Sequence, residues 1–76
     1  MKYRAMLRME QVLAFCVHFY ELESARMTKV EITPNRKHTG YNVVLTPEKV
    51  GADLLEKSFR GGLLNLWGWD KNFTKN

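Results

Sequence analysis

The first third of the chain is rich in apolar residues and has neither glycine nor proline before Pro34. On a helical wheel of about 100° per residue, its apolar side chains gather on one side and cover more than half of the circumference. This spacing, together with the good helix formers up to Ala14, predicts a helix over residues 5–24. The apolar side chains are those of Met6, Met9, Val12, Leu13, Phe15, Cys16, Val17, Phe19, Tyr20 and Leu22.

A strand pattern competes with the helix in this segment. Apolar residues also occupy every second position from Leu13 to Phe19, which is typical of a half-buried strand. A strand over residues 12–20 would make the protein a three-stranded antiparallel meander with one helix. However, no Gly, Pro, Asn or Asp lies between Tyr20 and Lys29, where the meander requires a turn. The helix is therefore favoured, and the strand remains the alternative.

The middle of the chain has the pattern of a β-hairpin. Alternating apolar residues predict one strand over residues 28–33 and another over residues 41–46. The sequence between them is Pro34-Asn35-Arg36-Lys37-His38-Thr39-Gly40, which consists of turn-forming and polar residues. We therefore expect the two strands to be antiparallel neighbours.

A second helix is predicted directly after the hairpin. Thr46 can cap its first turn, Pro47 suits the first helical position, and Gly61-Gly62 ends it. Gly51 lies in the middle of its apolar face, where a small residue lets the first helix or the hairpin approach closely. Residues 63–73 contain both tryptophans and are too apolar to remain free in water. This tail either folds back to close the core, for example as a third strand, or docks on another molecule.

Together these elements define an α+β protein with one small domain over residues 1–76, in the order helix, β-hairpin, helix and apolar C-terminal tail. A composition of 45% hydrophobic and 26% charged residues is typical of a soluble domain. It excludes a disordered chain, a collagen and a membrane-spanning helix. The single cysteine, Cys16, excludes an intramolecular disulfide and fits a reducing compartment. No signal-peptide cleavage site follows the basic start, so the protein is predicted to be cytoplasmic.

No combination of residues indicates catalysis or a bound cofactor. A structural zinc site usually needs four ligands, and Cys16 is accompanied by only two histidines. Ser24 and Ser58 lack the sharp strand-to-helix turn that exposes a nucleophilic serine. Glu21 and Glu23 diverge on a helix and cannot act as an acid–base pair. The sequence therefore predicts a non-enzymatic protein without catalytic residues, metal or cofactor.

The charge pattern indicates an anionic partner. Twelve Lys and Arg against eight Asp and Glu give a net charge of +4, which suits nucleic acid or an acidic protein surface. Basic residues concentrate in the hairpin loop, whose tip can reach phosphates or a groove while an amide contacts base edges. The first hypothesis is therefore nucleic-acid binding through Asn35, Arg36, Lys37 and His38, with Arg4, Arg8 and Lys29 as flanking charge.

The alternative hypothesis is an accessory protein, an inhibitor or adaptor, that docks on a larger protein target. The apolar arc of the first helix exceeds what a hairpin and one short helix can cover, so we also expect a homodimer. A membrane is disfavoured as a partner, because only Lys71 and Lys75 accompany the tryptophans. The residues predicted to form a protein interface are Phe15, Leu22, Trp67 and Trp69.

Overall fold

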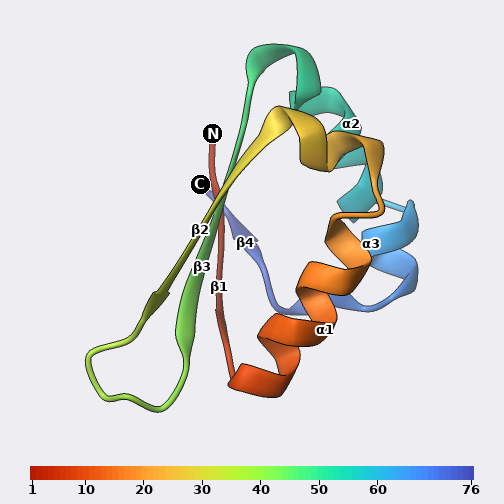
Figure 1. Cartoon of the computed structure of the whole chain (residues 1–76). Coiled ribbons are helices and arrows are strands. Elements are labelled where there is room, and N and C mark those ends of the chain that lie inside the picture. The colour runs from red at the N-terminus through yellow and green to blue at the C-terminus, as the bar shows by residue number, and fades with distance from the viewer.

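The chain folds into a four-stranded antiparallel sheet with helices packed against one of its faces, as a computed structural model of residues 1–76 shows (Figure 1). The strand order is β2-β3-β1-β4. Two interleaved β-α-β units produce this order, which is the split β-α-β, or ferredoxin-like, topology. The elements are β1 (Tyr3–Leu7), α1 (Met9–Phe19), β2 (Thr28–Pro34), β3 (Tyr41–Pro47), α2 (Ala52–Phe59), α3 (Leu63–Leu66) and β4 (Thr74–Lys75).

The α+β class and the hairpin are confirmed. Strands β2 and β3 pair in the antiparallel sense with Val30 opposite Leu45, so Val30 lies on the helix side with Val43 and Leu45, while Ile32 is exposed. The hairpin extends beyond the helical layer at one end of the molecule (Figure 1). Strand β3 continues to Pro47, which pairs with Thr28. The predicted cap at Thr46 and helix start at Pro47 are therefore wrong, and α2 begins only after Gly51.

The opening segment differs from the prediction of one helix over residues 5–24, because Tyr3–Leu7 is a strand and α1 ends at Phe19. Tyr3, Ala5 and Leu7 are buried while Arg4 and Met6 are exposed, which is the two-residue period of a strand. Strand β1 lies between β3 and β4 in the sheet. Its pairing with these distant segments outweighs the helix propensity of its alanine, methionine and leucine. The helix α1 begins at Met9 and includes residues 12–19, so the alternative strand over residues 12–20 is wrong.

The core lies between the sheet and the helices and is centred on Phe15 of α1, which is wholly buried. Its ring lies 5.1 Å from the ring of Phe19, 5.0 Å from that of Phe73 and 5.3 Å from that of Trp69. The C-terminal tail thus folds back to close the core, which is the first of the two alternatives expected for it. Its last residues form β4, where Lys75 pairs with Tyr3.

Gly51 lies against Met27, at the end of the 3-10 turn Glu23–Met27. A Cβ atom at position 51 would lie 2.6 Å from the Met27 Cβ. The expected close approach is therefore present, but the neighbour is neither the first helix nor the hairpin. This contact explains why a glycine is needed at the position that precedes α2.

Replacing Gly51 with alanine is expected to lower the free energy of unfolding by about 1–3 kcal/mol, because the new methyl group overpacks the contact with Met27. Urea denaturation measures the change. Lys57→Ala, at an exposed position of α2, is the control and is expected to stay within about 0.5 kcal/mol of the wild type. A Gly51→Ala variant as stable as the wild type would contradict the close contact.

Candidate nucleic-acid interface

The face of the sheet opposite the helices, here called the open face, carries polar and basic side chains. Alternate residues of each strand point toward it, because their neighbours point into the core. Arg4 lies opposite Thr74 of β4 on one side and Val44 of β3 on the other. The open face comprises Arg4 and Met6 of β1, Lys29, Glu31 and Thr33 of β2, Asn42, Val44 and Thr46 of β3, and Thr74 of β4.

The tip of the β2–β3 hairpin continues this face. Arg36 and Lys37 are exposed and line a shallow hollow of about 440 Å³. Met6 and Asn42 of the open face line the same hollow, together with Asn35 and Thr39 of the loop. The two loop cations therefore lie beside the sheet surface that carries Arg4 and Lys29.

Asn35 organises the loop instead of facing a partner. Its side chain is 8% exposed. Its Nδ2 atom donates to Thr39 Oγ1 at 3.0 Å, and its Oδ1 atom accepts from the Thr39 amide at 3.0 Å. The expected contact between this amide and base edges stays a prediction, although both polar atoms already bond within the hairpin. Asparagine commonly makes such bonds to nearby backbone in turns.

Arg8 and His38 lie away from the hollow at the hairpin tip. Arg8 precedes α1, and its Nε atom lies 3.0 Å from Glu10 Oε1. His38 adopts a positive φ of 55°, uncommon for a residue other than glycine. It lines a different hollow, with Met9 and Tyr41 among its neighbours. Of the seven predicted nucleic-acid contacts, Arg4, Lys29, Arg36 and Lys37 lie on this side of the sheet, with Arg36 and Lys37 at the hairpin tip and Lys29 near the opposite end of β2.

The four cations on this side form no ion pair within the chain. The ion pairs present join Arg8 to Glu10, and both Arg60 and Lys75 to Glu56. The open face has one carboxylate, Glu31, whose backbone lies across Val44 from that of Arg4, about 10 Å away at two strand spacings, and which is two residues from Lys29 along β2. Four cations against one carboxylate leave a net positive surface that is available to an anion.

The open face has no aromatic side chain. Tyr3 points into the core, and Tyr41 lies on the helix side of its strand, paired with Pro34. Single-stranded nucleic acid is generally held by stacking its bases on exposed aromatic rings. The open face therefore suits contacts to the sugar-phosphate backbone, which come from Lys, Arg, Thr and Asn side chains.

The sequence alone does not identify Met6 and Asn42 as neighbours of the loop cations. For Met6 and Asn42 the signal was present but weak. The alternation of Tyr3, Ala5 and Leu7 with polar or exposed residues marks β1, and β1 places Met6 beside Asn42. The role of Thr39 depends on the folded loop.

The residues predicted to form a protein interface are largely enclosed. Phe15 is 0% and Trp69 is 8% exposed, so neither side chain is available at the surface of the monomer. Trp69 Nε1 donates to His18 Nδ1 at 3.2 Å, and the Trp67 ring packs on the His18 ring at 4.6 Å. Leu22 and Trp67 are half-buried against the core. The tryptophan tail thus completes the core of its own chain. Phe15 and Trp69 are therefore not available for docking on the surface of the monomer.

Comparisons with known proteins give no relative. No family model, curated protein or solved structure matches the chain. None of the helices combines the length and apolar character needed to cross a bilayer. Nowhere do three or more histidine, cysteine, aspartate or glutamate side chains gather closely enough to hold a metal ion.

Proposed function

We propose that this protein binds nucleic acid, with the open face against the phosphates and the β2–β3 tip reaching into a groove. The observation that carries the proposal is the placement of Arg4, Lys29, Arg36 and Lys37 on one side, without acidic partners. Lys and Arg that neutralise phosphates release counterions, and this release supplies most of the affinity of non-specific binding.

The shape of the site favours a duplex over a single strand. A two-stranded β-ribbon fits the major groove of B-DNA, which is about 12 Å wide. The β2–β3 hairpin is such a ribbon, and it extends beyond the helices (Figure 1). The open face also lacks the aromatic rings that a single strand requires.

Fluorescence anisotropy with a labelled DNA duplex, and with one of its strands alone, tests the proposal. At low salt the protein is expected to bind the duplex more tightly than the strand. The logarithm of the affinity should fall with the logarithm of the salt concentration at a slope of about −3 to −4, since four cations contribute about −0.9 each. Absence of binding to DNA and RNA at low salt, or binding only to an acidic protein, would contradict it.

We further propose that the protein forms a homodimer through one flank of α1. Met9, Leu13, Val17 and Tyr20 follow each other along this flank and are 52–64% exposed. The accessible surface of the chain is 5213 Å², whereas a monomer of its mass typically has about 4,800 Å². An apolar helix flank of this kind is covered in many small proteins by a second copy.

The charges at the two ends of α1 favour a second copy as the occupant. Arg8 precedes the helix, and Glu21 and Glu23 follow it. When two α1 helices pack antiparallel about a twofold axis, Arg8 of each, which pairs with Glu10 of its own chain, lies beside the acidic residues that follow the other. Such a dimer would also present two basic hairpins to one nucleic acid.

Analytical ultracentrifugation tests this dimer. The wild type is expected to sediment as a dimer at micromolar concentration, and Leu13→Asp as a folded monomer, because a buried carboxylate at the contact is unfavourable. Ala14→Asp is the matched control, since Ala14 is exposed on another side of α1 and its variant should remain dimeric. A monomeric wild type, or a dimer that survives Leu13→Asp, would contradict the contact.

A further inference from the structure

A third hollow lies between α2, the β1–β4 edge of the sheet and the 3-10 turn Trp69–Lys71. Its volume is about 270 Å³, and aromatic rings form part of its wall. The Tyr3 ring stacks on the Phe59 ring at 4.6 Å, and the Phe73 ring lies 5.5 Å from that of Phe59. The hollow is separate from the nucleic-acid site, because Tyr3 points toward the helices and its neighbour Arg4 points to the open face.

The Tyr3 hydroxyl is a buried polar group without a partner. Tyr3 is 4% exposed, and its hydroxyl makes no hydrogen bond. Its position in a central strand and its stacking on Phe59 hold the ring in place. Burial raises the pKa of this phenol above its ordinary value, so the hydroxyl remains protonated and can donate. A phenylalanine would provide the same stack, so the hydroxyl itself calls for a role such as contact with a ligand.

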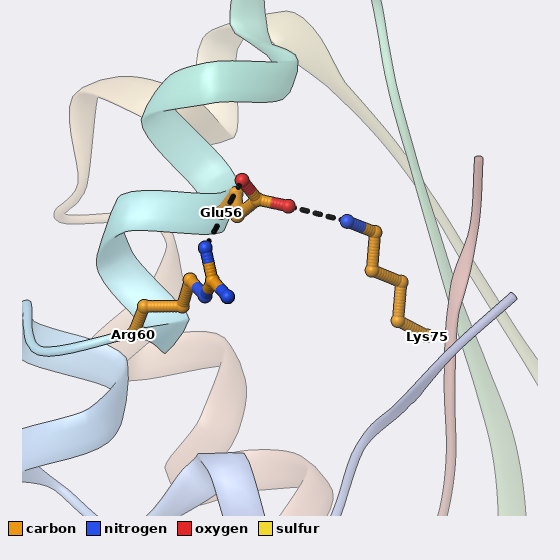
Figure 2. A network of polar contacts seen from close by, with 3 residues as sticks. All are labelled: Glu56, Arg60 and Lys75. Atoms are coloured by element: carbon orange, nitrogen blue, oxygen red, sulfur yellow. Dashed lines mark hydrogen bonds and ion pairs between the residues drawn. The ribbon is translucent and has the colours of Figure 1, made fainter.

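Among the charged residues around the hollow, Asp70 is unpaired and Arg60 has only one long ion pair. Glu56 binds Lys75 of β4 closely, and Figure 2 shows it between Lys75 and Arg60. The hydrogen bond from Lys75 lowers the pKa of Glu56, which stays ionised. Arg60 reaches Glu56 only at 3.9 Å, and Asp70 forms no ion pair. Arg60 and Asp70 thus line one hollow without pairing with each other.

We propose that this hollow binds a small zwitterion, namely a free α-amino acid with an apolar side chain. The carboxylate would be held by the guanidinium of Arg60 and the hydroxyl of Tyr3. The ammonium group would be held by the carboxylate of Asp70, and the side chain would lie against Phe59 and Phe73. A planar guanidinium matches a carboxylate with two parallel hydrogen bonds.

The size and the charge balance of the hollow favour this class of ligand. At about 30 Å³ for each water, 270 Å³ corresponds to roughly nine waters, which is close to the number of non-hydrogen atoms in leucine. Two carboxylates, Glu56 and Asp70, balance two cations, Arg60 and Lys75. A simple anion or cation would therefore meet a like charge, whereas a zwitterion complements both.

Isothermal titration calorimetry with L-leucine and L-phenylalanine tests the proposal. At least one of them is expected to bind at concentrations up to about 10 mM, which would saturate a site of millimolar affinity. N-acetyl-L-leucine, which lacks the ammonium group, and leucinamide, which lacks the carboxylate, are each expected to bind at least about tenfold more weakly. Failure of both amino acids to bind, or equal binding of the blocked compounds, would overturn the proposal.

Substitutions of residues that line the hollow test whether the amino acid binds there. Arg60→Gln and Asp70→Asn are each expected to weaken it by about 10-fold or more, because each removes one charge-assisted contact. Tyr3→Phe should fold, since it keeps the stack on Phe59, and should bind less tightly. Lys57→Gln, on α2 but outside the hollow, should bind like the wild type. Binding that survives both Arg60→Gln and Asp70→Asn would overturn the assignment to this hollow.

Discussion

Replacing Phe15 with alanine is expected to lower the free energy of unfolding by about 3–5 kcal/mol. Phe15 is wholly buried, and the rings of Phe19, Trp69 and Phe73 surround it within 5.3 Å. These rings come from the first helix and from the C-terminal tail, so a cavity at this position would loosen the contact between the two ends of the chain. Circular dichroism during thermal unfolding measures the change.

The size of the domain makes this effect severe. At about 0.05–0.15 kcal/mol per residue, a chain of 76 residues is stable by roughly 4–11 kcal/mol. The loss of 3–5 kcal/mol would lower the melting temperature by about 4–8 °C for each kcal/mol. Leu66→Ala is the control, because Leu66 is 76% exposed and its truncation should change stability by less than about 0.5 kcal/mol. Equal losses for Phe15→Ala and Leu66→Ala would contradict the core.

Replacing both Arg36 and Lys37 with glutamine is expected to reduce the affinity for a DNA duplex by about tenfold or more at low salt. The two side chains line the hollow that joins the hairpin tip to the open face, and neither is neutralised by an acid of this chain. Each lost phosphate contact should also bring the salt slope about 1 closer to zero. Anisotropy titrations of the double variant over a range of salt concentrations measure both changes.

A matched double variant distinguishes binding at the open face from attraction by the net charge of the protein. Lys57→Gln with Lys71→Gln removes the same net charge from the helical layer, where both side chains are exposed. This variant is expected to keep most of the affinity and the salt slope of the wild type. Equal weakening by the two double variants would mean that net charge, rather than the open face, binds the nucleic acid.

The elements that could be predicted from the sequence are those specified by local patterns. The hairpin has two alternating strands and a loop of turn formers, so it was predicted within about one residue at each end. Strand β1 has five residues, and its partners, Leu45 and Lys75 among them, are distant in the sequence. Its identity is decided by tertiary pairing, which local propensity does not report.

The candidate interface could be predicted only in part, because local patterns mark some of its residues and tertiary pairing places the others. The loop cations Arg36 and Lys37 were identified from the charge of the turn. Arg4 lies on the same side of the molecule as these cations because β1 pairs with β3, and this pairing is not visible in the local sequence. The role of Asn35 could have been inferred from the tendency of asparagine to bond to nearby backbone in turns. The burial of Trp69 depends on His18, which is 51 residues away in the sequence.

The most direct measurement of the proposed interface is a chemical-shift map of the amide groups as a DNA duplex is added at low salt. The largest shifts are expected at Arg4, Lys29, Arg36, Lys37 and Asn42, with little change along α2. Shifts concentrated on α1 and α2, with the open face and the hairpin tip unchanged, would contradict nucleic-acid binding through this side of the sheet.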